Sequence, residues 1–266
     1  MTYTHGHHES VLRSHTWRTA ENSAGYLLPH LRPGLRLLDV GCGPGTITLD
    51  LARLLAPGQV IGLDASSEVV TQAQAHAAEA EAASANVHFE VGDLFALKYD
   101  DASFDVVHAH QVLQHLVDPV AALVELRRVL RPDGVLAARD SDYGAFAWAP
   151  ADPVLDRWIE IYLAVTTRNG HNARIGPALL GLAHAAGFSD VTVSSTTWTF
   201  ADPASRQWWG GLWADRVQYS RFAEQAVAYG LSDINELESI AEAFANWAGS
   251  PDGVFVVPHV EILAHR

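Results

Sequence analysis

A glycine-rich stretch, Asp39-Val-Gly-Cys-Gly-Pro-Gly-Thr46, follows the first strongly apolar segment of the chain. Gly41, Gly43 and Gly45 let the backbone turn sharply and approach a ligand without side-chain obstruction. A turn of this kind from a strand into a helix leaves amide N–H groups at the helix N-terminus that can bind a ligand. The spacing differs from the G-x-G-x-x-G of nicotinamide enzymes, because the third glycine comes one position early and Thr46 takes the last position.

Two aspartates at the ends of later apolar segments extend this pattern. Asp64 ends the second predicted strand, about 20 residues after the turn, where a carboxylate can accept both hydroxyls of an adenosine ribose. Asp93 ends the third predicted strand, beside the next position along the sheet. A glycine-rich turn alone could be structural, but together with both acids it predicts a nucleoside-type ligand.

The stretch His108-Ala-His-Gln-Val-Leu-Gln-His115 includes the end of the fourth predicted strand. In an open parallel sheet the ligand lies beyond the carboxyl ends of the strands, so His110 and Gln111 should project toward the reacting group. Histidine suits a general base, because its unperturbed pKa is about 6.5. We predict that His110 is a base or orients the substrate, with packing at a helix start as the alternative. His115 is a candidate substrate contact, although Asp118-Pro119 beyond it also fits a structural turn.

The segment from His15 to Pro29 precedes the first predicted strand. Asn22 and Tyr26 within it are four positions apart, so they would lie on one helical face. Tyr26 could hydrogen-bond His110 or the substrate, which makes it the second candidate catalytic residue. Ordinary helix packing is the alternative for this tyrosine.

Tryptophans are concentrated in the last third of the chain, at positions 208, 209 and 213. Trp209 and Trp213 are four positions apart and would share one helical face. Simple packing between helices could account for these rings. The functional interpretation is a substrate pocket with flat apolar walls, formed by Trp209 and Trp213, for an aromatic or heteroaromatic small molecule. One of the arginines at 174, 206, 216 and 221 could orient a substrate carboxylate, although arginines more often form surface ion pairs.

Alternating strands and helices must position these residues. Strands are predicted at 35–40, 60–63, 87–91, 104–108 and 134–139, and helices at 46–55, 66–83 and 119–130. Strands separated by helices pair in parallel through right-handed crossovers. The pattern therefore predicts an α/β fold with a doubly wound, mostly parallel, Rossmann-like sheet.

Beyond residue 140 this alternation ends. The sequence predicts an aromatic loop at 143–148, helices at 153–167 and 174–186, a strand at 191–197, two or three helices within 202–247, and a last strand at 254–263. The later strands would bring the sheet to seven strands. We expect one domain over 1–266, with a helical cover at 1–34, a cofactor-binding core at 35–140, and a helical, aromatic-rich substrate cap at 141–173 and 201–250.

The charged residues exclude several classes of protein. The chain has 31 acidic and 17 basic residues, a formal net charge of −14, and no basic run that could hold a nucleic-acid backbone. Lys98 is the only lysine, and Leu94 stands four positions before it. A P-loop, a pyridoxal site and the tyrosine–lysine pair of a short-chain dehydrogenase are therefore unsupported.

The sequence also allows predictions about the cellular compartment of the protein and about metal binding. Cys42 is the only cysteine, so no intrachain disulfide can form, and we expect a packing role for it in the glycine-rich turn. No apolar stretch approaches the roughly 18–20 residues that span a bilayer, and the first residues lack the features of a signal peptide. We expect a cytoplasmic protein with no membrane partner. The tract His5-Gly-His-His8 has no companion ligands at metal spacing, so we predict a tail there and no metal.

Several of these residues resemble the class I S-adenosylmethionine-dependent methyltransferases over about residues 36–140. The matching motifs are Asp39-Val-Gly-Cys-Gly-Pro-Gly45, Gly62-Leu-Asp64, Gly92-Asp-Leu94, Ser103-Phe-Asp-Val-Val107 and Glu125-Leu-Arg-Arg-Val-Leu-Arg-Pro-Asp-Gly134. Within this family the chain is most similar to the ubiquinone/menaquinone-type and natural-product small-molecule methyltransferases.

The resemblance implies S-adenosylmethionine as the cofactor. Gly41 and Gly43 would pack against its methionine portion, Asp64 would hold its ribose, and Asp93 with Leu94 would frame its adenine. The segment before the first strand resembles the helix that closes over the cofactor in this family. The expected cofactor contacts are Asp39, Gly41, Gly43, Gly45, Asp64, Ala65, Asp93, Leu94, His110 and Gln111.

These observations predict a cytoplasmic methyltransferase of small-molecule biosynthesis. Its substrate would be a small aromatic or heteroaromatic metabolite, such as an indole or a phenol, methylated on oxygen, nitrogen or carbon. Two alternatives stay open, namely a nicotinamide-dependent oxidoreductase and a non-catalytic cofactor-binding protein. The glycine spacing and the missing tyrosine–lysine pair oppose the first of these. We expect no nucleic-acid partner, and a homodimer is compatible with the sequence.

Overall fold

One sheet of eight strands organises the part of the chain that the computed structural model describes, residues 16–80 and 86–266. Its order is β3-β2-β1-β4-β5-β8-β6, and β7 also pairs with β8. The strands are β1 (Leu37–Val40), β2 (Val60–Asp64), β3 (Val87–Val91), β4 (Phe104–His110), β5 (Leu130–Ser141), β6 (Ala147–Ala149), β7 (Asp190–Phe200) and β8 (Val254–His265). The predicted tail at His5 to His8 lies outside the described residues.

The pairing of the strands confirms the predicted doubly wound, mostly parallel α/β sheet. β1 to β5 pair in parallel, and β8 runs antiparallel to β5, β6 and β7. The sheet has eight strands rather than seven, because Ala147–Ala149 pair with Val254–Val256 of β8. The sequence pattern predicted an aromatic loop there, since a strand of three residues is too short to show an alternation of apolar and polar residues.

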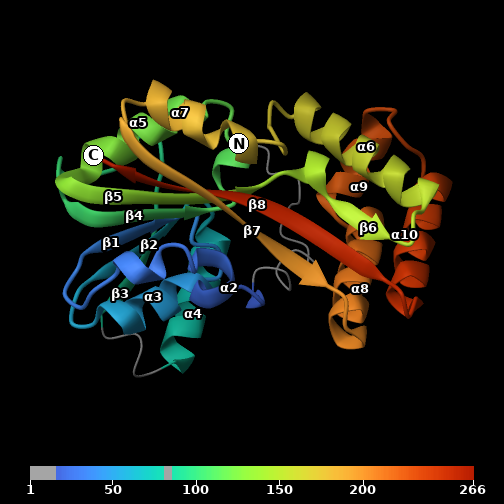
Figure 1. Cartoon of the computed structure of the whole chain (residues 1–266), viewed down its shortest axis with the longest axis horizontal. Coiled ribbons are helices and arrows are strands. Elements are labelled where there is room, and N and C mark those ends of the chain that lie inside the picture. Colours follow the sequence, from blue (N-terminus) through green and yellow to red (C-terminus); the bar gives the residue numbers. More distant parts are fainter. Residues whose placement is uncertain (1–15, 81–85) are drawn as a thin grey trace.

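Helices cover both faces of the parallel strands (Figure 1). α2 (Ala20–Ala24) and α3 (Thr46–Leu55) pack on one face, and α5 (Pro119–Val129) and α7 (Leu179–Ala185) pack on the other. α4 (Ser67–Glu79) lies beside β3. Pro177 cannot donate the hydrogen bond that a helix starting at residue 174 would need there. For this reason α7 begins later than predicted, after a 3-10 turn at Gly176–Ala178.

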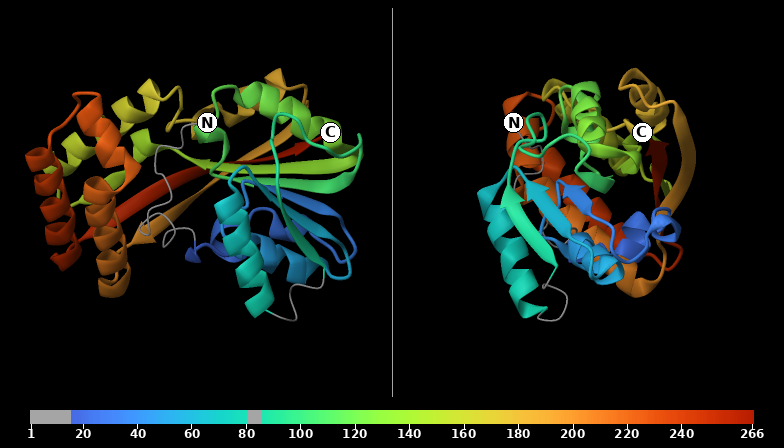
Figure 2. Two further views of the ribbon diagram at one scale, coloured as in Figure 1. Left: turned by 180° about the vertical axis from the view of Figure 1, so that it is seen from behind. Right: turned by 90° about the vertical axis from the view of Figure 1, so that its left-hand side faces the viewer.

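The remaining helices form a second lobe at one end of the sheet (Figure 1, Figure 2). α6 (Pro153–Arg168), α8 (Pro203–Tyr219), α9 (Arg221–Ala228) and α10 (Ile234–Gly249) pack around β6 and the ends of β7 and β8. Aromatic rings dominate the core of this cap. Trp158 and Trp213 meet edge to face with centroids 4.5 Å apart, and Trp213 stacks on Phe244 at 5.9 Å.

Two long strands join the cap to the parallel core. β8 pairs with β5 through His259–His265 and with β6 through Val254–Val256. β7 pairs with β8 along its whole length. Because continuous backbone hydrogen bonds run from the core into the cap, the cap is held at a defined place relative to the carboxyl ends of β4 and β5.

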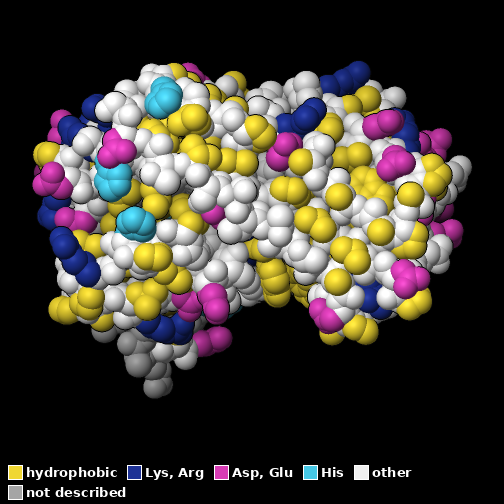
Figure 3. Space-filling model, in the orientation of Figure 1, with side chains coloured by type: hydrophobic (Ala, Val, Ile, Leu, Met, Phe, Trp, Pro, Cys, Tyr) yellow, Lys and Arg dark blue, Asp and Glu magenta, His cyan; other side chains and the backbone are white. Residues whose placement is uncertain are grey.

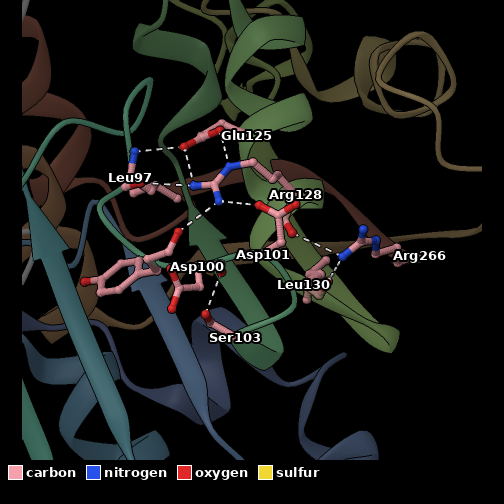
Figure 4. A network of polar contacts seen from close by, with 9 residues as sticks. Leu97, Asp100, Asp101, Ser103, Glu125, Arg128, Leu130 and Arg266 are labelled. Carbon is pink, nitrogen blue, oxygen red and sulfur yellow. Dashed lines mark hydrogen bonds and ion pairs between the residues drawn. The ribbon is translucent and has the colours of Figure 1, made fainter.

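An arginine of α5 fastens the loop between β3 and β4 (Figure 4). Arg128 donates two hydrogen bonds to the Glu125 carboxylate, at 2.9 and 2.8 Å, and one to Asp101 at 2.7 Å. It also donates to the backbone carbonyls of Leu97 and Tyr99, at 3.0 and 2.9 Å. Glu125 in turn accepts a hydrogen bond from the N–H of Leu97. The family-like motif around Glu125 thus has a positioning role for the loop that leaves β3.

The surface in Figure 3 shows basic side chains scattered among acidic ones. This face therefore offers no continuous cationic patch for a phosphate backbone. None of the described helices combines the length and the hydrophobicity that crossing a membrane requires.

Candidate functional site

The glycine-rich turn joins β1 to α3 through backbone conformations that favour glycine. Gly41, Gly43 and Gly45 have φ angles of 65°, 57° and 83°. A Cβ atom on Gly41 would lie 2.5 Å from a methyl carbon of Val112, so a side chain there would force a shift. Gly45 immediately precedes α3, and no side chain caps the first turn of that helix. Its N-terminal amides are therefore suited to binding a polar or anionic group of a ligand.

Asp64 ends β2 and is tied to this turn. Its Oδ2 accepts a hydrogen bond from the N–H of Gly43 at 3.2 Å, and its Oδ1 accepts one from Ser66 at 3.0 Å. The carbonyl of Leu63 accepts a hydrogen bond from the N–H of Gly41 at 2.7 Å. Asp64 is only half-buried. Its carboxylate is thus held in one orientation at an accessible place, as hydrogen bonding to a ribose diol requires.

The residues after β3 extend the same edge of the sheet. Asp93 is exposed, and its Oδ1 accepts a hydrogen bond from the N–H of Phe95 at 2.9 Å. Leu94 is buried, and Ala65 is exposed after the end of β2. Because β3, β2, β1 and β4 are neighbours in that order, the two acids, the glycine-rich turn and the residues after β4 follow one another along the carboxyl edge. This arrangement fits an elongated nucleoside cofactor.

Asp39 is buried beneath the turn. Its Oδ2 accepts a hydrogen bond from the Thr48 hydroxyl at 2.5 Å, and its Oδ1 lies 2.7 Å from Nδ1 of His108. Asp39 and His108 are also register partners in the β1–β4 ladder. Both carboxylate oxygens are engaged inside the protein, so Asp39 supports the turn from below. A direct cofactor contact by Asp39 stays a prediction.

Cys42 packs within the turn. Its side chain is 8% exposed and belongs to the apolar cluster between α3, α4 and β3. Burial raises the pKa of the Cys42 thiol well above its usual range, and the carboxylates of Asp39 and Asp64 raise it further. A thiol that stays protonated is a poor nucleophile, which agrees with the expected packing role.

A row of buried polar side chains crosses one face of the sheet, and the sequence pattern did not predict it. The strand register places His110 beside Arg139, and Arg139 opposite Glu261. Nε of Arg139 donates to Oε1 of Glu261 at 2.9 Å, and each of the two residues is 1% exposed. Ser194 and Thr196 of β7 add hydroxyl contacts to the Glu261 carboxylate. Charged residues inside otherwise apolar strands were the available signal, because such residues are rarely buried without a partner.

His110 is the last residue of β4 and is buried beside this row. Its ring centroid lies 5.8 Å from that of Trp198 and 6.2 Å from that of His259. Neither ring nitrogen has a hydrogen-bond partner among the described residues. Burial lowers the pKa of His110 well below its usual range, and the charges of Arg18 and Arg139 lower it further. The ring is therefore neutral at pH 7, and a ring nitrogen can accept a hydrogen bond from a ligand.

Gln111 connects three parts of the structure. Its φ angle of 54° lies in the left-handed region that favours glycine. Its Oε1 accepts a hydrogen bond from Nη2 of Arg18 at 2.7 Å, and its Nε2 lies 2.8 Å from Nε2 of His259. Backbone strain of this kind persists only where surrounding contacts hold it, and it is concentrated at functional sites.

A cavity lies where the cap meets the residues that follow β4 and β5. It is open to solvent, and about 350 Å³ of space between and outside the lining side chains, open solvent included, belongs to it. Six of its lining residues are aromatic: Trp17, Tyr143, Phe146, Trp198, Trp208 and Trp209. Trp209, a predicted substrate contact, stacks on Phe200 with centroids 4.4 Å apart. Trp213 is fully buried in the cap core and is not among the lining residues, so it can act on the cavity only through its neighbours.

Tyr26 and His115 do not line this cavity. The Tyr26 hydroxyl is buried with no hydrogen-bond partner among the described residues, and burial raises its pKa well above the usual range. The ring of His115 lies 6.0 Å from that of His171, and burial lowers the pKa of His115 to about 3. The predicted catalytic role of Tyr26 and the substrate contact of His115 stay predictions.

Comparison with known sequences identifies the chemistry that this edge of the sheet serves. Residues 31–164 match a family model described as a methyltransferase domain. An uncharacterized methyltransferase of Schizosaccharomyces pombe is 33% identical over 269 residues, which cover 99% of this chain and 96% of that protein. These matches argue against the nicotinamide-dependent and non-catalytic alternatives.

Solved structures show the same fold. The YcgJ protein from Bacillus subtilis is similar with a TM-score of 0.60 and 21% identity, over 92% of this chain and 99% of that chain. A phosphoethanolamine N-methyltransferase from Haemonchus contortus, in complex with phosphomonomethylethanolamine and S-adenosylhomocysteine, is similar with a TM-score of 0.54 and 17% identity. That match covers 88% of this chain and 50% of the nematode chain. With the glycine-rich turn, the two acids and the full-length relative in agreement, the chain belongs to the class I S-adenosylmethionine-dependent methyltransferase family.

Proposed function

We propose that this methyltransferase acts on a small aromatic or heteroaromatic metabolite, with an oxygen, nitrogen or ring carbon as the methyl acceptor. The observation that carries the proposal is the cavity with six aromatic lining residues, which lies next to Gln111 at the carboxyl end of β4. A flat ring packed against the tryptophan side chains of the wall would bury apolar surface worth about 25 cal/mol per Å². It would also gain favourable contacts between the rings.

We infer that the glycine-rich turn and the two acids hold the cofactor in the extended arrangement that the family implies. S-adenosylmethionine supplies a methyl group that its sulfonium charge already activates. The backbone of the turn at Gly41 and Gly43 would contact the methionine portion, and the Asp64 carboxylate fits the ribose hydroxyls. Asp93 and Leu94 are left to frame the adenine. The main task of the chain is then to align the acceptor at about 3–3.5 Å from the methyl carbon and to exclude water.

His110 is the residue that we propose for orienting the acceptor. Its neutral ring is not among the described residues that line the cavity, but it lies beside Trp198, which does line it. The nitrogens of the ring have no hydrogen-bond partner among the described residues. A ring nitrogen that accepts a hydrogen bond from a substrate O–H or N–H would turn the acceptor lone pair toward the methyl group. The acceptor proton leaves toward the same nitrogen as the new bond forms. Because the lowered pKa makes this ring a weak base, orientation is its larger contribution.

The proposal is tested by methyl incorporation from labelled S-adenosylmethionine into a panel of indoles, phenols, aromatic amines and aromatic acids, with aliphatic amines of similar size as the control. We expect incorporation into at least one aromatic compound and none into the aliphatic set. Incorporation into aliphatic compounds alone would contradict the aromatic substrate. Calorimetry with S-adenosylhomocysteine and NAD checks the cofactor independently, with binding expected only for the first.

The charge of the protein bears on its partners. The net charge of −14 favours a small-molecule substrate over a nucleic acid. A homodimer and a cytoplasmic location stay predictions. Light scattering decides the first of these, because the monomer has a mass of 28.8 kDa.

A further inference from the structure

Two arginines reach the aromatic cavity from different parts of the chain. Arg216 of α8 and Arg18, which precedes α2, both line it. Arg216 is only 4% exposed, and its Cζ lies 4.6 Å from the ring centroid of Trp213. Cζ of Arg18 lies 5.6 Å from the ring centroid of Trp198. Contact with these rings holds both guanidinium groups at the cavity.

The charged side chains among the described residues of the cavity wall are both cations, Arg18 and Arg216. Among the described residues that line the cavity there is no aspartate or glutamate. Tyr143 in the wall responds to both arginines, because burial raises the pKa of its phenol while the charges of Arg216 and Arg18 each lower it. Two cations therefore act on one place in a protein whose net charge is −14.

Two carboxylates flank the wall residue Ser141 in the sequence, and one of them is close enough to feel Arg18, because burial raises the pKa of Asp140 while the charge of Arg18 lowers it. Oδ1 of Asp140 accepts a hydrogen bond from the N–H of Gln114 at 3.3 Å. Oδ1 of Asp142 accepts one from the N–H of Gly144 at 2.9 Å. Neither of these two acids lines the cavity.

We propose that the substrate is an aromatic acid, with its ring between the aromatic walls and its carboxylate bound by Arg216. Arg18 adds positive charge, and its hydrogen bond to Gln111 fixes it close to the end of β4. This inference rests on the proposed function, because it assigns the same cavity to the substrate. A planar guanidinium can bind a carboxylate through two parallel hydrogen bonds, which gives both affinity and a fixed orientation. The chemical class that the cavity selects is thus a flat ring with one anionic substituent.

The experiment compares aromatic acids with their neutral primary amides, which have nearly the same shape. The probes are benzoic acid and benzamide, indole-3-carboxylic acid and indole-3-carboxamide, and quinoline-2-carboxylic acid and its amide. Binding to the protein saturated with S-adenosylhomocysteine is followed by calorimetry and by tryptophan fluorescence, which needs no turnover. We expect at least one acid to bind about 10- to 100-fold more tightly than its amide, as the loss of charge-assisted hydrogen bonds predicts.

Substitutions of single arginines test whether Arg216 causes the preference for the acid over the amide. Arg216→Gln should abolish the preference for the acid while the amide binds as before, and Arg216→Lys should keep part of it because the charge remains. Arg221→Gln, at an exposed position on α9 outside the cavity wall, is the matched control and should behave as the wild type. Thermal unfolding of each variant shows whether it is folded. If Arg216→Gln does not fold, the preference for the acid over the amide is measured in Arg18→Gln instead.

The outcomes separate this inference from the proposed function. Equal affinity for acid and amide in the wild type, no binding of any acid, or a preference that survives both Arg216→Gln and Arg18→Gln would each overturn the inference. Methyl transfer to neutral aromatic compounds only would agree with the proposed function and contradict the inference that the substrate is an aromatic acid. Tight binding of an acid without methyl transfer to any compound of the panel would support the inference and count against the proposed function.

Discussion

Arg139 of β5 and Glu261 of β8 face each other in the strand register, and 2.9 Å separate Nε of the first from Oε1 of the second. The pair lies between His110 on β4 and the hydroxyl side chains of β7, so it anchors the polar row that crosses the sheet. Burial of two charges is costly in itself, and the contacts around the pair offset that cost. Loss of either partner should therefore lower the free energy of unfolding, because the other charge would stay buried without compensation.

Glu261→Gln leaves the Arg139 guanidinium buried beside a neutral amide. We expect the free energy of unfolding to fall by about 3–5 kcal/mol, because an uncompensated buried charge remains. Urea denaturation measures the change. Arg53→Ala removes the exposed pair between Arg53 and Asp50 and is the control, with an expected change of less than about 1 kcal/mol. Similar losses in both variants would show that burial of the pair is unimportant.

Asp64→Asn should weaken the binding of S-adenosylmethionine by about 10- to 100-fold, because one charge-assisted acceptor for the ribose hydroxyls is lost. The asparagine oxygen can still accept the hydrogen bond from Gly43, so the turn itself should persist. Calorimetry gives the dissociation constant. Asp133→Asn changes an exposed aspartate near the start of β5 and should leave the dissociation constant unchanged. An unaltered constant in Asp64→Asn would remove this residue from the cofactor site.

His110→Ala should leave the dissociation constant for the cofactor nearly as it is and lower kcat by about 100-fold or more on an acceptor that carries a proton. The reason is that the His110 ring contacts Trp198, which lines the proposed substrate cavity, and does not contribute to the glycine-rich turn. Calorimetry and single-turnover methyl transfer separate the two effects. His30→Ala, at an exposed position, serves as the control. A wild-type rate in His110→Ala would exclude this residue from the reaction.

Asp140 should make stability fall as the pH rises from about 4 to about 7. Burial raises its pKa from 3.8 to about 7, against hydrogen bonds from the backbone of Gln114 and Leu113 that lower it. Between these values the unfolded chain has released the proton and the folded chain retains it, so increasing pH favours unfolding. The difference is absent below about pH 4, where both states are protonated.

Asp140→Asn removes this titration and should be more stable than the wild type at pH 8, with the difference shrinking toward pH 4. Urea denaturation across this range measures it, with Asp133→Asn as the exposed control. A constant difference between Asp140→Asn and the wild type at every pH would contradict the raised pKa.

The parallel core was predictable because its signals are local. The helix expected at 46–55 is α3 with the same bounds, since its apolar residues repeat at helical spacing and Gly45 stands just before it. The glycine-rich turn, Asp64 and Asp93 follow strands whose apolar runs are short and continuous. In a parallel sheet the carboxyl ends of such strands lie along one edge, so spacing along the chain is enough to bring these residues together.

Contacts between distant segments were not predictable in this way. Arg139 and Glu261 are separated by 122 positions, and their pairing depends on the register of β8 against β5. Gln111 and His259 are separated by 148 positions. The strand β6 exists because the last strand extends beyond the core and offers three residues to pair with. No periodicity within a segment carries information of this kind.

The doubly wound sheet, the glycine-rich turn and the family were predictable from the chain alone, because turn glycines, strand-end acids and apolar periodicity are properties of short segments. Which side chains of the cap meet at the cavity depends on tertiary packing. Trp209 and Trp213 lie one turn apart on α8, yet the first lines the cavity and the second is buried between α6 and α10. Arg216, one turn further, reaches the cavity again. The angle at which α8 crosses its neighbours determines this difference, and that angle results from the packing of segments far apart in the chain.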